Sequence, residues 1–394
     1  TVSCPDGSSY KLKIVAIAEE IDRENKTITI GQRVINYGTE ESLTNIYVAL
    51  YNDGTLVFSN KNDFEESKIL ENGNFGNIKD EHYELEITEE GPNMEKLPPW
   101  LKLMIEGTTI SGIDFASEIV PNNDNIGNIF IGLDVTEIGN IENLNTSNVT
   151  KMSNVFAFCQ GSDIDFGKLD LSNVTDMSNM FWNSSITNVN LSGLDLSNVT
   201  DMSNMFSNSS ITNVDLSGLD LSNVTDMSEM FSYSSITNVD LSGSDLSSVT
   251  DMSNMFNNSK VVSVDFSNSD TSNVTDMTNM FYACSRLTNV NLTGIDTSKV
   301  RSMGNMFAYC TQLTNLDVSP LDTSNVTDMR RMFSDCRNLE SINVSNFDVT
   351  NMINNPNGVK GMFGNITAPI TISSAWTEEM QKITSYGGSG FVIK

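Results

Sequence analysis

LDLSNVTDMSNMF occupies residues 169–181 and returns without a change at residues 194–206. The methionine in the middle of this stretch recurs every 25 residues five times and then every 26 residues twice, at Met152, Met177, Met202, Met227, Met252, Met277, Met303 and Met329. A fixed period of this length is typical of a solenoid, in which each repeat forms one coil of a stack. The repeat therefore decides the fold of about half of the chain.

Each unit combines two apolar patterns. The first is apolar-x-x-apolar-x-apolar, the strand signature of a leucine-rich repeat, as at Ile186, Val189 and Leu191. The second has steps of three and four, which favour a short helix or 3₁₀ turn behind the strand, as at Val199, Met202, Met205 and Phe206. The predicted fold class is mainly β with short helical turns, and we interpret the repeated Met and Phe as core.

A small side chain stands three residues after each of these phenylalanines. It is Cys or Ser, at Cys159, Ser184, Ser209, Ser234, Ser259, Cys284, Cys310 and Cys336. Stacked coils place Cys284, Cys310 and Cys336 about 5 Å apart, within reach of a disulfide. Three in a row cannot all pair, so we expect buried free thiols.

Aspartates also recur in register and predict ladders of like charge. One column contains Asp195, Asp220, Asp245 and Asp270. Neighbouring carboxylates about 5 Å apart repel each other by roughly 0.8 kcal/mol even in water. Two explanations are open: each carboxylate accepts hydrogen bonds from its own turn, or Ca²⁺ bridges the coils at these four residues. The sequence indicates no other cofactor.

The outward strand positions predict a flat surface of small polar groups. Its residues in three consecutive units are Thr187, Asn188, Asn190, Thr212, Asn213, Asp215, Thr237, Asn238 and Asp240. This surface lacks the Trp, Tyr and Arg anchors of tight interfaces. Weak, repeated contact with a ligand suits it, and a passive solvated face remains the alternative.

Asn-Val-Thr recurs in most units, and it matches the acceptor motif for N-linked sugar in a secreted protein. The candidate glycosylation sites are Asn148, Asn173, Asn198, Asn223, Asn273 and Asn325. Ser248 and Lys299 replace the Asn in two other units, so turn chemistry explains the motif equally well.

Composition narrows the classes of partner. A net charge of −29 argues against nucleic acid and anionic membranes, both of which would be repelled. No apolar run is long enough to insert in a membrane. Because the chain starts at Thr1, we expect a processed, exported protein at the cell surface or outside the cell.

The string D-x-S-x-V-T-x-M-x-x-M-F, followed by C/S and L-T-x-L/V-x-L, resembles the BspA-like leucine-rich-repeat family. The resemblance covers about residues 129–370. That family comprises surface proteins of bacteria and some protists, so the resemblance implies attachment or recognition through proteins or glycans on another surface.

The segments on either side of the repeat predict two further parts. Alternating strand-like runs and an Asn52-Asp53-Gly54 turn favour an Ig-like β-sandwich over residues 1–128, before a solenoid over residues 129–370. Residues 371–394 predict a cap helix and a short strand. In that strand Phe391, Val392 and Ile393 are candidates for assembly with another copy.

Catalytic residues are not evident, because the only histidine is His82 and no nucleophile or phosphate loop appears. We therefore expect no enzyme. The favoured hypothesis is an exported, non-enzymatic surface protein that mediates attachment or recognition. The alternative is a structural subunit, a homo-oligomer that assembles head-to-tail into an extracellular filament or surface layer.

Overall fold

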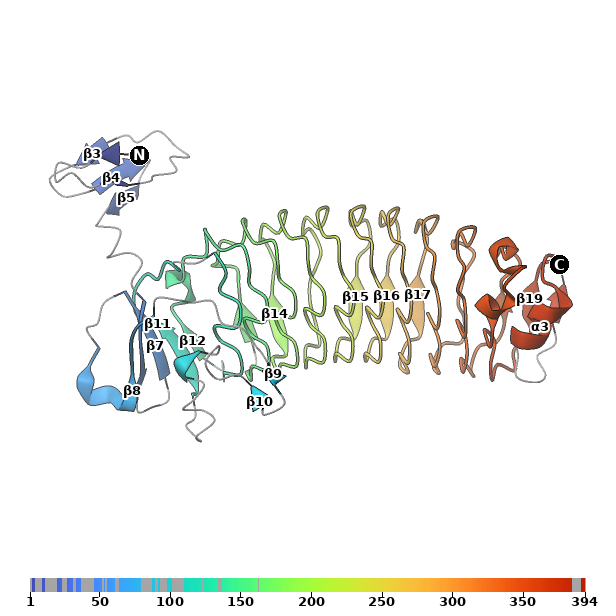
Figure 1. Ribbon diagram of the computed structural model, residues 1–394, viewed down its shortest axis with the longest axis horizontal. Coiled ribbons are helices and arrows are strands. Elements are labelled where there is room, and N and C mark those ends of the chain that lie inside the picture. Colours follow the sequence, from blue (N-terminus) through green and yellow to red (C-terminus); the bar gives the residue numbers. More distant parts are fainter. Residues whose placement is uncertain are drawn as a thin grey trace.

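The computed structural model describes most of the repeat region and separate parts of the flanking segments. The described residues are 2–3, 9–10, 20–22, 27–30, 33–36, 46–51, 53, 55–60, 64–78, 87–88, 91–92, 98–100, 110–121, 124–133, 137–161, 163–384 and 391–393. Within these ranges the chain is mainly β structure and turns, with almost no helix (Figure 1).

Three small antiparallel sheets lie in the N-terminal part. Their strands are β1 (Val2–Ser3) with β2 (Ser9–Tyr10), β3 (Glu20–Asp22) with β4 (Thr27–Ile30) and β5 (Arg33–Asn36), and β9 (Ile87–Thr88) with β10 (Gly91–Pro92). The described strands do not show the two packed sheets of an Ig-like sandwich, which stays a prediction for residues 1–128.

A five-stranded sheet leads into the solenoid. Its order is β12-β11-β7-β6-β8, and its strands are β6 (Ile46–Tyr51), β7 (Thr55–Ser59), β8 (Ile69–Ile78), β11 (Gly112–Phe115) and β12 (Glu137–Gly139). The strand β6 is antiparallel to β7 and β8, whereas β11 is parallel to β7 and β12. Pairing thus changes from antiparallel to parallel within this sheet. The domain boundary between residues 128 and 129 stays a prediction.

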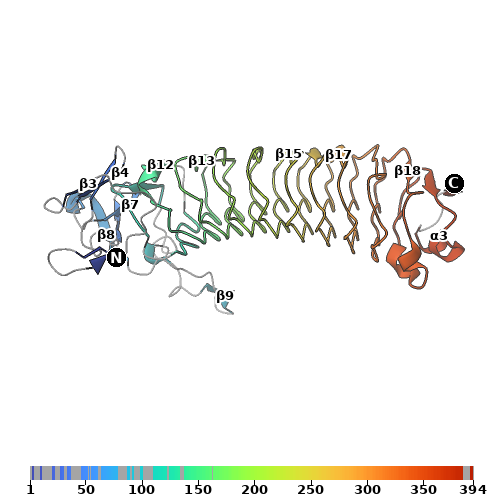
Figure 2. The same ribbon diagram turned by 90° about the horizontal axis from the view of Figure 1, so that it is seen from above.

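Parallel coils then stack in a single row toward the C-terminal end (Figures 1 and 2). Their strands are β13 (Asp163–Asp165), β14 (Asn188–Asn190), β15 (Asn238–Asp240), β16 (Ser263–Asp265), β17 (Asn289–Asn291), β18 (Ile342–Asn343), β19 (Ile370–Ile372) and β20 (Phe391–Ile393). The 3₁₀ helices are η1 (Glu66–Lys68), η3 (Ile141–Asn143), η4 (Thr350–Met352) and η5 (Pro356–Val359), and α3 spans Glu378–Thr384. The partners in β14 and β13 differ by 25 residues, which confirms the solenoid and its repeat.

The apolar segment behind each strand is a chain of tight turns rather than a regular helix. Asn179 and Asn183 have φ values of 55° and 54°, a left-handed conformation that interrupts a helix and that Asn tolerates. The amide of Asn179 therefore donates to the Ser203 carbonyl of the next coil, at 2.9 Å. Hydrogen bonds between coils alternate with turn bonds inside the unit, such as the bond from the Trp182 amide to the Asn179 carbonyl at 2.9 Å, so single turns form but no continuous helix does.

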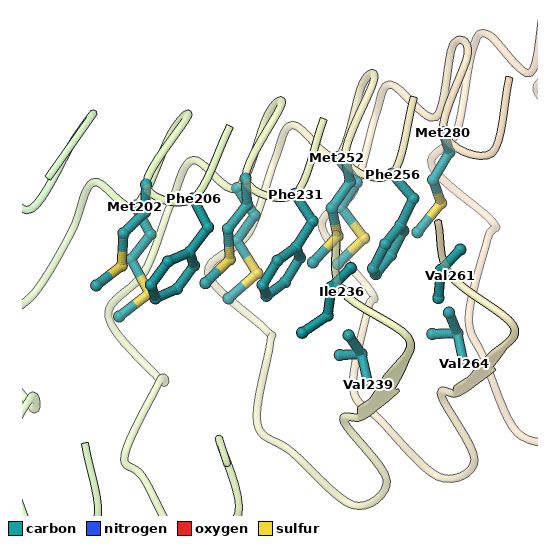
Figure 3. Packing of buried hydrophobic residues seen from close by; sticks show 14 of the residues in the cluster. Met202, Phe206, Phe231, Ile236, Val239, Met252, Phe256, Val261, Val264 and Met280 are labelled. Carbon is teal, nitrogen blue, oxygen red and sulfur yellow. The ribbon is translucent and has the colours of Figure 1, made fainter. Parts of the chain in front are cut away.

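Stacked phenylalanine rings form the centre of the core, which we call the Phe ladder: Phe130, Phe156, Phe181, Phe206, Phe231, Phe256, Phe281, Phe307, Phe333 and Phe363. Successive ring centroids are 5.2–6.0 Å apart. The methionines lie beside them and face strand residues such as Ile236 and Val239 (Figure 3). Met202 and Met252 have no exposed surface, which confirms the core role of this residue type.

Gly358 is a buried residue of η5 and lies against Thr327 and Met352. A Cβ atom there would lie 2.6 Å from the carbonyl oxygen of Thr327 and 2.8 Å from Cγ of Met352. We expect Gly358→Ala to lower the free energy of unfolding by about 1–3 kcal/mol through overpacking, measured by urea denaturation. Gly304→Ala is the control, because its Cβ would meet only the Asp328 carboxylate at 3.4 Å. Equal stability of the two variants would contradict this prediction.

Candidate functional site

The residues predicted to contact a ligand form a regular polar surface, the ladder face. Its threonines are half-buried and its Asn and Asp residues are exposed: Thr187, Asn188, Asn190, Thr212, Asn213, Asp215, Thr237, Asn238 and Asp240. The amide of Thr212 donates to the Thr187 carbonyl at 3.1 Å, and that of Thr237 to the Thr212 carbonyl at 3.3 Å. Backbone hydrogen bonds therefore hold these side chains at the spacing of the coils.

The aspartates of the ladder face are held in place by their own turns. Asp215 Oδ1 accepts hydrogen bonds from the hydroxyl of Ser217 at 2.6 Å and from its amide at 3.0 Å. These bonds lower the pKa of Asp215, the hydroxyl having the larger effect. The carboxylate is thus charged and oriented, on a residue that is exposed. The ladder face can accept and donate many hydrogen bonds in a repeating pattern.

The four aspartates predicted as calcium ligands also bond within their turns. Asp195 and Asp220 each accept the hydroxyl of the serine two residues later at 2.6 Å. These bonds lower the pKa of Asp195 and Asp220, as the bond from Ser272 lowers that of Asp270. Asp245 accepts the Ser247 amide at 3.0 Å. Among the described residues, no group of three or more His, Cys, Asp or Glu could hold a metal ion.

A cleft that sequence patterns did not predict opens between two coils on one edge. The strand ladder is interrupted between β14 and β15, and a space of about 280 Å³ is lined by Ser217, Gly218, Leu219, Asp220, Asp240, Ser242, Gly243, Ser244 and Asp245. Ser244 stands where earlier units have Leu169, Leu194 and Leu219. The replacement of leucine by serine at this position was the only sign of the cleft in the sequence, because the shorter side chain leaves the space between the turns unfilled.

The asparagines of the Asn-Val-Thr motif connect coils. Asn173, Asn198 and Asn223 are exposed, and each donates through Nδ2 to a serine carbonyl of the preceding coil at 2.7 Å. Asn273 and Asn325 make the same bond, and Asn148 is exposed. Lys299, which replaces Asn in this column, instead donates to Oδ1 of Asn273. Glycosylation stays a prediction, and the bonds give the motif a structural role of its own.

The described cysteines are buried free thiols: Cys159, Cys284, Cys310 and Cys336. Burial raises the pKa of Cys284 to about 12, and it also raises the pKa of Cys310. Each of the four thiols donates to a phenylalanine carbonyl of the preceding coil, at 2.9–3.1 Å. Cys4 lies outside the described residues.

We expect these four thiols to be inert toward an aromatic disulfide reagent at pH 8 in the native protein, because their burial keeps the reagent away from the sulfur atoms. They should react when the protein is unfolded in guanidinium. Counting the modified cysteines in a Cys4→Ser variant measures this directly. Rapid native labelling of any of the four would show that the coils open locally.

Two further features bear on partners. The predicted assembly strand is β20, which pairs in parallel with β19 at the end of the sheet. No helix among the described residues is long and apolar enough to cross a membrane. His82 lies outside the described residues.

Comparison with known protein families finds a family model that matches this chain repeatedly. The family described as "Mycoplasma protein of unknown function, DUF285" matches residues 124–244, 158–268, 210–292 and 288–385. The matches overlap and together cover residues 124–385, as expected for a family defined by a repeat. No curated protein and no solved structure matches the chain.

Proposed function

Because this chain belongs to the DUF285 family, whose description assigns no function, we propose a role from its geometry: attachment or recognition through the ladder face. The observation that carries this proposal is the ladder face itself. It presents the same Thr, Asn and Asp positions on coil after coil, at a spacing held by backbone hydrogen bonds. Such a surface suits a ligand that is also repetitive, such as a glycan polymer or a protein array, because weak contacts add up along it.

Charge and chemistry support a binding protein that is not an enzyme. The solenoid carboxylates recur in every coil and most bond to their own turns, whereas a catalytic site requires a local, distinct arrangement. The excess of negative charge disfavours nucleic acid and anionic lipid as ligands. A neutral or cationic partner fits this surface better.

The cellular setting belongs to the same proposal. Parallel coils with an apolar-x-x-apolar-x-apolar strand are compatible with a BspA-like leucine-rich-repeat protein. On this basis we propose that the protein acts outside the cell or on its surface.

A binding assay with matched variants tests the proposal. Asn213→Lys combined with Asn238→Lys places two cations on adjacent coils of the ladder face. Ser185→Lys combined with Tyr233→Lys adds the same charge at exposed positions elsewhere. On arrays of glycans and surface proteins, the first variant should lose the ligand that wild type binds, and the second should retain it. Equal binding by both variants would exclude the ladder face.

Head-to-tail assembly into a filament is the second candidate. It is favoured by β20, which is the last strand in the described order β18-β19-β20 and carries two exposed apolar side chains. Electron microscopy across a range of concentration separates the two roles, because regular fibres appear only if the copies join end to end in one direction.

A further inference from the structure

A row of aromatic side chains runs along one edge of the solenoid. We define this aromatic edge as the two residues that follow each phenylalanine of the Phe ladder from Phe156 to Phe307. Its aromatic residues are Phe158, Trp182, Tyr233, Tyr282 and Tyr309. Tyr233 and Tyr309 are 57% and 43% exposed, and the other three are half-buried. The remaining positions hold Asn, Ser or Ala, so the repeat itself does not require the rings.

The backbone conformation disfavours three of these aromatic residues. Phe158, Tyr233 and Tyr309 have φ values of 59°, 55° and 63°, in the left-handed region that asparagine tolerates and bulky side chains rarely adopt. Asn208 and Asn258 occupy the same position in other coils. Tyr233 has more than half of its surface exposed, so burial in the monomer recovers little of this cost. Strain that the fold does not reward indicates a function for the rings.

The order of the rings is the same when it is counted from either end. Among the seven coils of the aromatic edge, the rings occur in the first, second, fourth, sixth and seventh, and Tyr233 belongs to the middle coil. Phe158 and Trp182 pack in a T-shaped pair with a centroid distance of 4.9 Å. Tyr282 and Tyr309 form a second T-shaped pair at 5.5 Å. The Phe ladder advances by 5.2–5.7 Å per coil on both sides of the middle coil, so rotation by 180° matches ring with ring.

The aromatic edge carries no charge. None of its fourteen residues is acidic or basic, although the net charge of the chain is −29. Two copies of the chain therefore repel each other less along this edge than along the aspartate columns. Tyrosine and tryptophan are also the residues that most often anchor protein interfaces. A second copy of this chain fits both the neutral surface and its symmetrical pattern.

Charge on either side of the middle coil favours an antiparallel orientation of the two copies. Residues 156–230 contain ten acidic residues and one basic residue, a net charge of −9. Residues 256–330 contain seven acidic and five basic residues, a net charge of −2. Parallel solenoids would place the two more acidic stretches side by side. Antiparallel solenoids place each of them beside the less acidic stretch of the other copy.

We propose that two copies of this chain associate side by side and antiparallel through their aromatic edges, about a two-fold axis at Tyr233. Tyr233 then lies opposite Tyr233 of the second copy. Trp182 lies opposite Tyr282 of the second copy, and Phe158 lies opposite Tyr309. This contact is self-complementary, and it buries the rings that are exposed in the monomer. No residue of the ladder face takes part, so the dimer is independent of the proposed function.

The dimer is reversible. The aromatic edge contributes only two residues from each coil, so the interface lies at the small end of specific protein contacts. Unfolding measured at low protein concentration therefore reports on the monomer.

Sedimentation of the full chain without ligand, over a range of concentration, tests the dimer. Wild type should convert from monomer to dimer as the concentration rises. Tyr233→Asp should abolish the dimer, because it places two carboxylates opposite each other, and aspartate accepts the left-handed conformation of this position. The matched control is Asn213→Asp, which adds the same charge to the ladder face and should retain the dimer. Monomers at every concentration, or dimers that persist in Tyr233→Asp, would overturn the proposal.

A second variant removes the ring without adding charge. Tyr233→Asn introduces the residue that this column has at Asn208 and Asn258, so the fold should be retained. It should raise the dissociation constant of the dimer by about tenfold or more, as loss of a central aromatic anchor does. An unchanged dissociation constant would exclude Tyr233 from the interface.

Disulfide trapping tests the orientation of the two copies. Asn208→Cys and Asn258→Cys are prepared as two separate variants, each in a Cys4→Ser background. An antiparallel dimer places Asn208 opposite Asn258 of the second copy, whereas a parallel dimer places each residue opposite itself. Mild oxidation of an equimolar mixture should therefore give the mixed disulfide, identified by peptide mapping, much faster than either variant alone gives a covalent dimer. Faster crosslinking of each variant with itself would exclude the antiparallel arrangement.

Discussion

Replacement of Phe256 by alanine is expected to lower the free energy of unfolding by about 3–5 kcal/mol. The ring is completely buried and stacks on Phe231 and Phe281, with centroid distances of 5.5 and 5.2 Å. The ring also packs in a T-shaped arrangement with Phe266, at a centroid distance of 6.5 Å. Each coil is stabilised mainly by its two neighbours, so a cavity at this position weakens the coils on both sides. Urea denaturation followed by circular dichroism measures the loss.

Two variants serve as controls for Phe256→Ala. Phe256→Leu keeps most of the buried volume and should lose much less stability. Tyr233→Ala removes an aromatic ring that is 57% exposed and should leave the unfolding free energy nearly unchanged. If Phe256→Ala and Tyr233→Ala had the same stability, the Phe ladder could not be the main source of cohesion between coils.

Replacement of Asp335 by alanine is expected to destabilise the C-terminal end of the solenoid by about 3 kcal/mol. Asp335 is buried, has a φ of 62°, and receives hydrogen bonds from Arg337 at 2.6 Å, from Asn365 at 3.1 Å and from Ser334 at 3.1 Å. Alanine removes the acceptor of all three donors and also tolerates the left-handed conformation less well. The guanidinium of Arg337 is exposed and remains hydrated, which limits the loss.

The contribution of Asp335 should depend on pH. Burial alone would raise the pKa of its carboxyl, but the hydrogen bonds from Arg337, Asn365 and Ser334 outweigh burial and lower the pKa below 3.8. A carboxyl whose pKa is lower in the folded state than in the unfolded state stabilises the fold at pH values above the unfolded pKa. This stabilisation is lost as the pH falls through the folded pKa.

Asp335→Asn is the variant that isolates this charge, because asparagine keeps the shape and the left-handed conformation. The difference in unfolding free energy between wild type and Asp335→Asn should have its full size at pH 7 and should decrease as the pH falls below about 4. A difference that stays constant from pH 7 to pH 3 would show that the charge of Asp335 does not contribute.

Sequence patterns predicted the repeating part of the fold well. The apolar positions of each unit, such as Val199, Met202 and Phe206, are buried, and the Cys and Ser column lies in the interior. These predictions succeed because one coil constrains all the others: a residue that is buried in one coil faces its equivalents above and below. The Asx turns of Asp195 and Asp220 also follow from local chemistry, since the partner is only two residues away.

Positions where the repeat changes could not be predicted in the same way. The left-handed Asn179 and Asn183 replace the expected helix because their amides bond to the next coil, an interaction that spacing within one unit does not reveal. The four-residue network of Asp335, Arg337, Asn365 and Ser334 joins side chains up to thirty residues apart. The cleft beside Ser244 depends on the packing of two whole turns.

The sequence by itself determined that the chain is a stack of coils, which side chains fill its core and which form its polar columns, because a strict period transfers each local preference to every coil. Only the tertiary structure decided how one coil bonds to the next. The left-handed Asn179 directs its amide to the Ser203 carbonyl of the next coil, and such a bond depends on a neighbour that spacing within one unit does not reveal.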